Sequence, residues 1–354
     1  MAVPIQNVYY LLCYAWDRLD SLDTVDVGAL SGDRIENLLG KVLHDGMSHL
    51  MRRGLDRGYL SVDQEGRQLR GKVLLVETAQ RLLLQQGRLA CRTDELSHDV
   101  PHNRVLKAAM RELAKLPGID RELGLDIKDL CRRLDDVSDV ELGPAAFRGV
   151  QLSQNLVRYG FLVEVARLVA GCLLPEQAGR GKVFRSFTSS DQQMGTLFEA
   201  FVRNFLIREQ RQFSVARPKV SWAVAGAASS DPRWLPEMQT DISLSRPDQT
   251  FIIETKCYAN ALQQRSEGAP KLISDHLYQL LTYLTHHALS TGSAPVGILL
   301  YAGLGPGQPL HYELGGQTVL VRSLDLDQPW ELIHQDLLAL ATELGTWPVE
   351  VAAQ

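Results

Sequence analysis

The sequence predicts a protein of mixed α/β and α+β class: a mostly helical α+β domain over residues 1–180, then a domain over residues 181–354 with the element order αβββαβ. A length of 354 residues exceeds one average domain and favours two. The polar stretch at residues 175–181, which contains Pro and Gly, is typical of a domain boundary. Because 45% of the residues are hydrophobic and 22% are charged, each half has enough apolar side chains to form a core.

The first half is expected to consist mainly of helices. Over residues 33–53 apolar side chains recur every three or four positions, which is the spacing of one helical face. Residues 8–19 are rich in aromatic side chains and are expected to form a buried amphipathic helix. Two more helices are predicted over residues 101–116 and 146–174. Within residues 58–77 the apolar runs YLSV and VLLVE flank a polar turn and predict two strands.

The second half alternates helical patterns with short apolar runs that are bounded by turn residues. The predicted elements are a helix (191–210), three strands (213–224, 238–244 and 250–257), a helix (274–289), a strand (295–301), two further short strands and a helix (330–344). This order is αβββαβ with additions at the carboxyl end.

Composition narrows the class of protein further. The five cysteines are scattered and form no C-x-x-C pair, so we expect buried thiols rather than disulfides or a zinc site. The sequence shows neither a run of about 18 apolar residues nor an amino-terminal cleavage signal, which predicts a cytoplasmic protein. A net charge of −5 argues against a protein that coats nucleic acid by charge alone. Residues 203–219 carry five basic side chains against one acidic and are the candidate DNA-binding groove.

The strongest local signal is an acid and a lysine at the end of an apolar strand. Glu254 and Lys256 are two residues apart, so their side chains project from one face of the strand. Asp241 lies thirteen positions earlier in a short strand of its own. If the two strands are antiparallel neighbours, a divalent cation such as Mg²⁺ would relieve the repulsion between the two carboxylates. Such a site suits phosphodiester cleavage, in which a cation activates water and Lys256 orients that water and offsets the developing charge.

The acid-x-Lys tripeptide is weak evidence by itself. Asp126 and Lys128 form the same pattern in a polar helical stretch that has no flanking apolar strand. The alternative interpretation of Glu254 and Lys256 is a solvated strand end with a surface ion pair of little energetic value.

Side chains on the flanking helices strengthen the catalytic hypothesis. Glu199 lies on the preceding helix, while Gln279 and Tyr283 lie four residues apart on the following helix and therefore share a face. With these residues the sequence resembles the PD-(D/E)xK nuclease superfamily, whose core is αβββαβ, and within it the members with a trailing Q-xxx-Y helix. Each of the three has a plainer alternative, as a helix-surface acid or as polar residues that cap the core.

The resemblance implies that six of these side chains form a catalytic site: Asp241, Glu254, Lys256, Glu199, Gln279 and Tyr283. It also implies that the cofactor is Mg²⁺, held by Asp241, Glu254, Glu199 and the backbone carbonyl of Thr255. Thr240 stands where the superfamily's name has proline, at a position that does no chemistry.

Four segments of the first half resemble the McrC family, the nuclease subunit of the McrBC modification-dependent (5-methylcytosine) restriction system. They are PIQNVYYLLCYAW (residues 4–16), LRGKV (69–73), DELS (94–97) and NRVLK (103–107). The resemblance implies that this chain is a DNA endonuclease subunit that cuts double-stranded DNA with modified cytosine. It further implies that residues 1–180 bind and stimulate an McrB-like AAA+ GTPase hexamer.

The sequence itself has no nucleotide-binding P-loop, because Gly71-Lys72-Val73 and Gly181-Lys182-Val183 lack the Ser or Thr of that motif. GTP would therefore be bound by the partner. Five arginines are candidates to approach that GTP, and the sequence does not choose among them: Arg70, Arg81, Arg88, Arg92 and Arg104. Two alternatives stay open, an autonomous PD-(D/E)xK DNA-repair nuclease and a catalytically silent adaptor of the GTPase. The net charge of −5 favours the partnered nuclease over the autonomous one.

Overall fold

The structure is a computed structural model and describes residues 3–17, 34–153, 156–175, 182–222, 234–257, 262–263, 271–303 and 309–348. The described chain forms two compact units. Residues 34–185 form the helical unit, and residues 3–17 together with residues 186–348 form the sheet unit. Of the predicted boundary stretch, residues 176–181 lie outside the described residues.

The helical unit is built on four helices: α2 (Ile35–Arg53), α4 (Pro101–Leu113), α5 (Arg121–Arg132) and α6 (Val157–Cys172). A 3-10 turn (Pro144–Phe147) and a small hairpin of β4 (Leu173–Pro175) and β5 (Lys182–Phe184) complete it. The helices predicted over residues 33–53 and 101–116 are confirmed, and α2 buries the apolar positions that predicted it. The helix predicted over residues 146–174 begins only at Val157, because the Gly- and Pro-containing segment before it forms the 3-10 turn.

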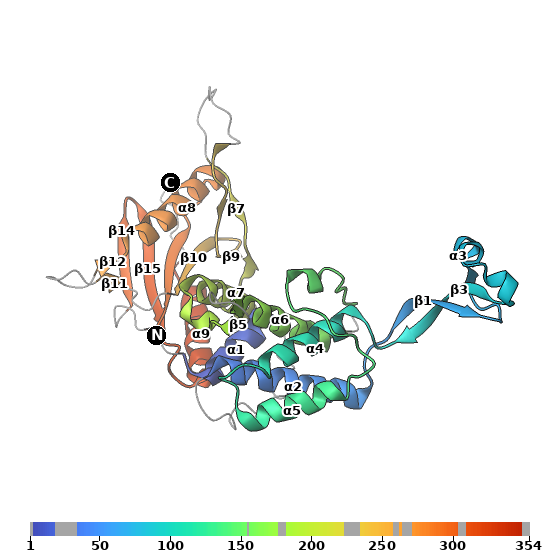
Figure 1. Ribbon diagram of the computed structural model, residues 1–354. Helices are drawn as coiled ribbons and strands as arrows, with labels where there is room; N and C mark the ends of the chain where they lie inside the picture. The colour runs from blue at the N-terminus through green and yellow to red at the C-terminus, as the bar shows by residue number, and fades with distance from the viewer. Residues whose placement is uncertain are drawn as a thin grey trace. The chain divides into compact units, whose positions relative to one another are not determined.

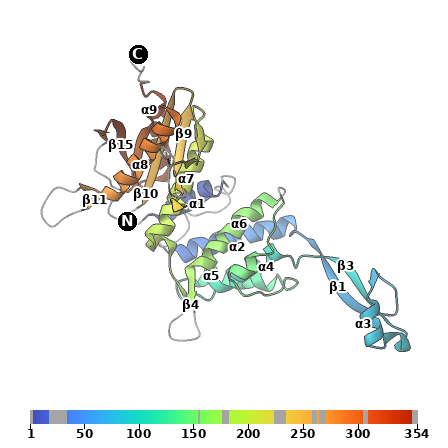
Figure 2. The same cartoon turned by 90° about the horizontal axis from the view of Figure 1, so that it is seen from above.

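A long antiparallel ribbon extends from these helices. Strands β1 (Gly58–Gly66) and β3 (Leu89–Ser97) pair along their full length, and Figures 1 and 2 both show the ribbon leaving the helices. Its far end carries β2 (Lys72–Val73), α3 (Leu75–Gln80) and a 3-10 helix (Leu83–Gln86). The strand predicted at YLSV is confirmed, but β1 runs through much of the expected turn, and the second predicted strand is wrong because most of that apolar run forms α3. The pairing of β1 with β3 is non-local, and local apolar runs do not reveal such a partner.

The sheet unit is centred on a six-stranded sheet in the order β14-β15-β13-β10-β9-β6. Its strands are β6 (Ser214–Ala216), β9 (Ile242–Arg246), β10 (Gln249–Cys257), β13 (Val296–Ala302), β14 (Leu310–Leu314) and β15 (Gln317–Leu324). Two short pairs form sheets of their own, β7 (Lys219–Val220) with β8 (Met238–Gln239) and β11 (Leu262–Gln263) with β12 (Lys271–Leu272). A 3-10 turn (Phe187–Ser189) precedes helix α7 (Asp191–Glu209), which contacts β10, while α8 (Ser274–Thr291) contacts β13 and α9 (Trp330–Gly345) contacts β15.

The sheet is mixed, and its centre is fully buried. Strand β10 runs antiparallel to β9 and parallel to β13, and all seven residues of β13 are buried, as expected for a central strand. The predicted order of elements is present, but two predicted strands are interrupted. Residues 213–222 yield β6 and β7, while residues 223 and 224 of that predicted strand lie outside the described residues. Residues 238–244 yield β8 and the first part of β9, with Asp241 at the break between them. A residue at such a break is released from strand pairing, so its side chain can serve a site.

Helix α1 (Ile5–Ala15) is the aromatic helix that the sequence predicts, and it is buried. Its place differs from the predicted domain of residues 1–180, because it belongs to the sheet unit. The rings of Tyr10 and Tyr14 pack on Phe201 of α7, with centroids 5.6 and 5.7 Å apart. The side-chain amide of Asn7 donates to the Leu326 carbonyl at 2.8 Å. The aromatic stripe of α1 thus complements a stripe on α7 that lies far away in the sequence.

All five cysteines are buried thiols, as the sequence predicts: Cys13, Cys91, Cys131, Cys172 and Cys257. Burial raises the pKa of the Cys13 thiol to about 12 and that of Cys257 to about 11, so neither is a ready nucleophile. None of the described helices combines the length and the apolar character that crossing a membrane requires.

Candidate active site

Strand pairing brings Asp241 and Glu254 together. In the antiparallel pair β9–β10, Ile242 lies opposite Ile253, so the residues that precede and follow them are neighbours. The backbone N–H of Asp241 donates to Glu254 Oε1 at 3.3 Å. Asp241 Oδ2 in turn accepts hydrogen bonds from the backbone N–H and the hydroxyl of Thr255, each at 2.9 Å. The two carboxylates are therefore held near each other at the start of β9.

Ionisation of Glu254 destabilises the folded state. The side chain is fully buried, and burial together with the nearby charge of Asp241 raises the pKa of Glu254 from 4.5 to about 7. The adjacent ammonium of Lys256 acts in the opposite direction and lowers it. A cation between the two carboxylates would remove most of this penalty.

Lys256 is fixed by residues on both sides. Its ammonium donates to Glu254 Oε2 at 3.2 Å and to Gln279 Oε1 at 3.0 Å. The Gln279 amide also donates to the Tyr283 hydroxyl at 3.1 Å. Because Gln279 and Tyr283 are four residues apart on α8, one helical face supplies both contacts. The structure thus joins these side chains to the acid and lysine of β10, and Tyr283 also contributes its ring to the core.

Glu199 lies on α7 near the same carboxylates. Burial and the charge of Asp241 raise its pKa, while Arg217 and Arg203 lower it. Its Oε1 atom lies 2.7 Å from Arg203 Nη1 and 3.1 Å from Arg217 Nε. Glu199 is therefore in the electrostatic field of the site, but one of its oxygens is already occupied by two arginines.

The oxygen donors suit a hard divalent cation. Mg²⁺ usually takes one or two protein carboxylates and completes its shell with water and phosphate oxygens. Asp241 and Glu254 offer such a pair, and Thr255, whose carbonyl is a further oxygen donor, directly follows Glu254. Across the described part of the chain, no three His, Cys, Asp or Glu side chains are grouped so as to hold a metal ion.

The family is shown by comparison with known proteins. A family model described as McrBC 5-methylcytosine restriction system component matches residues 6–302. This chain belongs to that McrBC family. The membership that the sequence motifs predict is thereby confirmed.

The chain is similar in sequence to one known restriction enzyme and in fold to one solved structure. The chain is 27% identical over 341 residues to the type IV methyl-directed restriction enzyme EcoKMcrBC of Escherichia coli K12, covering 96% of this chain and 98% of that protein. It also resembles a chain in the structure of McrB AAA+ hexamers with bound McrC from Thermococcus gammatolerans, with a TM-score of 0.60 and 18% identity. That match covers 96% of this chain and 76% of the other, and it supports the fold.

Other side chains of this McrBC family member adjoin the site without having been assigned to it from the sequence. Arg203 and Arg217 were predicted only as part of a basic stretch. Arg203 lies four residues after Glu199 on α7, a spacing that indicates a shared helical face, whereas no local pattern shows that Arg217 meets Glu199. The hydroxyl of Thr255 gives no signal in the sequence. Buried His276 on α8 hydrogen-bonds to the Tyr301 hydroxyl at 3.0 Å, and Tyr301 lies opposite Lys256 in the parallel pair.

Proposed function

We propose that this chain is the DNA-cleaving subunit of a GTP-dependent restriction complex that acts on DNA with modified cytosine. The sheet unit would be a PD-(D/E)xK domain that hydrolyses phosphodiester bonds with Mg²⁺. The observation that carries the proposal is the continuous set of hydrogen bonds from Asp241 through Glu254 and Lys256 to Gln279 and Tyr283. The order of α7, β9, β10, α8 and β13 around these residues supports it.

The carboxylates of Asp241 and Glu254 and the Thr255 carbonyl would hold the Mg²⁺ ion. When bound, Mg²⁺ would polarise the scissile phosphate and lower the pKa of a water molecule. The chain's own contribution is to keep the two carboxylates in place: Thr255 donates twice to Asp241, and the Asp241 backbone donates to Glu254. These bonds orient both acids before DNA arrives.

Lys256 would act on the attacking water and on the phosphate. Two of its three N–H donors are used by Glu254 and Gln279, which leaves one for a water or a phosphate oxygen. Its side chain is 12% exposed, so its charge is poorly screened and interacts strongly with the charge that develops at phosphorus. Gln279 and Tyr283 would serve as positioning residues for this ammonium.

We further propose that the helical unit binds and stimulates an McrB-like AAA+ GTPase hexamer. Support comes from the Thermococcus structure, which is of McrB AAA+ hexamers with bound McrC. It also comes from the absence of a P-loop in this sequence. In this arrangement the partner supplies GTP hydrolysis and recognition of modified cytosine, and this chain cuts.

The far end of the β1–β3 ribbon is the candidate contact surface for the partner. Five apolar side chains there are exposed: Leu69, Leu75, Val76, Leu82 and Leu84. Leu82 also has a left-handed backbone with φ 51°, which is rare for a residue other than glycine. Exposed apolar side chains gathered on one part of a protein mark an interaction site.

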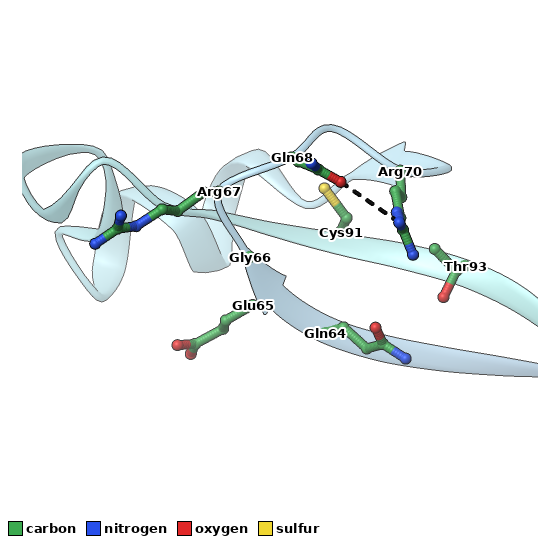
Figure 3. A pocket seen from close by; sticks show the side chains of 8 residues that line it. All are labelled: Gln64, Glu65, Gly66, Arg67, Gln68, Arg70, Cys91 and Thr93. Atoms are coloured by element: carbon green, nitrogen blue, oxygen red, sulfur yellow. Dashed lines mark hydrogen bonds between the residues drawn. The ribbon is translucent and has the colours of Figure 1, made fainter.

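Four of the five candidate arginines form ion pairs within the part of this chain that the structure describes, and one does not. Arg81, Arg88, Arg92 and Arg104 all pair with carboxylates of this chain. Arg70 instead donates to Gln68 at 3.4 Å, beside a cavity of about 320 Å³ at the end of β1 (Figure 3). Among the described residues no carboxylate pairs with Arg70, so we propose it as the arginine that approaches the partner.

The nuclease proposal is tested by Lys256→Ala in the complex. Cytosine-methylated and unmethylated plasmids are incubated with the chain and Mg²⁺, with and without the AAA+ partner and GTP. We expect cutting only when partner, GTP and methylation are all present, and a loss of at least about 100-fold in Lys256→Ala with GTPase stimulation retained. Cutting by the chain alone would favour an autonomous nuclease. GTPase stimulation without cutting by the wild-type chain would favour a silent adaptor.

The contact surface is tested by replacing Leu75 and Leu84 with Glu. Both side chains are exposed, so the fold should lose little stability while partner binding and GTPase stimulation fall at least tenfold. Leu125→Glu, at an exposed leucine on α5, is the matched control. Unchanged partner binding in the double variant would refute this surface.

A further inference from the structure

Two arginines meet on one oxygen of Glu199. Arg203 lies one turn further along α7, whereas Arg217 comes from the segment between β6 and β7. Both approach Oε1, at 2.7 and 3.1 Å. The Glu199 side chain is 14% exposed and that of Arg217 is 43% exposed. A part-buried carboxylate therefore anchors a guanidinium that faces solvent.

Backbone contacts place Arg217 beside Asp241. The Gln239 side-chain amide donates to the Arg217 carbonyl at 3.3 Å, and the Thr240 backbone N–H donates to the Pro218 carbonyl at 3.3 Å. Arg217 thus lies across from the residues that lead directly into Asp241. The charge of Asp241 also contributes to the raised pKa of Glu199, which places the two carboxylates close enough to interact.

The negative charges around the candidate site explain why DNA binding there needs an arginine. Asp241, Glu254 and Glu199 would repel a DNA backbone, and the ammonium of Lys256 is already engaged by two acceptors. A guanidinium has five N–H donors in a fixed fork. The Nε atom of Arg217 forms the ion pair with Glu199, so its terminal nitrogens can contact two oxygens of one phosphate.

We propose that Arg217 binds a DNA phosphate adjacent to the scissile one, and that Glu199 is the positioning residue that holds Arg217. Arg203 braces the same carboxylate. The proposal rests on the nuclease function proposed above and assigns Glu199 to an arginine rather than to the metal. The competing interpretation is a surface ion pair with no role in DNA binding.

Binding of a fluorescein-labelled DNA duplex to the purified chain, in EDTA and over a range of salt concentrations, tests the phosphate contact. Loss of one contact should reduce the slope of log affinity against log salt by about one and weaken binding about tenfold near 0.1 M salt in Arg217→Ala. Arg217→Lys keeps the charge and should lose less. Arg132→Ala, which removes the same charge from α5 of the helical unit, is the control and should leave the slope unchanged. A wild-type slope in both Arg217 variants would overturn the proposal.

The role of Glu199 is tested by comparing Glu199→Ala, Arg217→Ala and the double variant. If Glu199 acts through Arg217, the double variant binds DNA no more weakly than Arg217→Ala alone. Glu199→Gln still offers an oxygen to the arginines, so the Mg²⁺ concentration for half-maximal cleavage should match wild type. A several-fold rise in that concentration would show a metal ligand and overturn the positioning role.

Two readouts separate this inference from the nuclease proposal. If the wild-type chain never cuts DNA, with or without partner and GTP, the nuclease proposal fails while the salt slopes still decide the role of Arg217. If the wild-type complex cuts and Arg217→Ala raises KM with little change in kcat, both proposals stand. If it cuts and Arg217→Ala is indistinguishable from wild type in KM, only the inference fails.

Discussion

Glu254→Gln should inactivate the nuclease and yet stabilise the metal-free protein. The pKa of Glu254 is raised from 4.5 to about 7 by burial and by the charge of Asp241. One pH unit corresponds to about 1.4 kcal/mol, so the ionised carboxylate destabilises the metal-free fold by about 3 kcal/mol well above pH 7. Because Gln cannot ionise, Glu254→Gln removes this destabilisation. The gain is at most this figure, because a Gln amide has one acceptor oxygen where Glu254 uses two, toward Asp241 and Lys256.

The sign of the pH dependence follows from the direction of the shift. Because the pKa of Glu254 is higher in the folded chain, the folded state binds more protons and loses stability as the pH rises from about 4.5 through 7. The advantage of Glu254→Gln should therefore be small near pH 4.5 and largest above pH 7. Mg²⁺ should raise the stability of the wild type most at high pH, and that of Glu254→Gln much less.

Urea or thermal unfolding of the purified chain in EDTA, near pH 5 and near pH 8, measures this difference. A gain of a few kcal/mol corresponds to several degrees in Tm. Glu141→Gln makes the same chemical change at an exposed site and is the control. If Glu254→Gln were no more stable than wild type near pH 8, or gained as much near pH 5, the electrostatic reasoning would be refuted.

Two further substitutions test the packing of the sheet unit by urea unfolding. Gly297→Ala would place a Cβ atom 2.7 Å from Leu284 Cδ1, so either this leucine or α8 must shift, and we expect the fold to lose about 1–3 kcal/mol. A neutral result would show that the leucine moves aside freely. Phe201→Ala should cost about 3–5 kcal/mol because Tyr10 and Tyr14 of α1 pack on this ring, and Phe201→Leu should cost less. Equal stability of both Phe201 variants and wild type would show that α1 is not part of this core.

Spacing patterns within single elements predicted several of the contacts in the candidate site. The i, i+2 spacing of Glu254 and Lys256 predicts a shared strand face, and the structure has Lys256 Nζ 3.2 Å from Glu254 Oε2. The i, i+4 spacing of Gln279 and Tyr283 predicts a shared helical face, and their side chains are hydrogen-bonded. Both relations hold within a single element, where backbone geometry alone determines which side chains are neighbours.

Relations between elements were harder to predict. The apolar run after Val73 looked like a strand, but its side chains are exposed on the ribbon, and the strand that pairs with β1 starts only at Leu89. The contact of Arg217 with Glu199 joins helix α7 to the segment after β6, so no spacing rule within a single element applies. Only the packing of α7 against the sheet makes them neighbours.

The sequence by itself determined the family, the order of the main elements of the sheet unit and the residue types of the candidate site, because motifs and hydrophobic periodicity are properties of the chain read locally. Tertiary structure alone decided that α1 joins the sheet unit, since burial of Tyr10 and Tyr14 requires the facing surface of α7. It also decided the electrostatics of Glu254. The pKa of that carboxyl depends on its burial in β10 and on its distance from Asp241, and both exist only once β9 and β10 have paired.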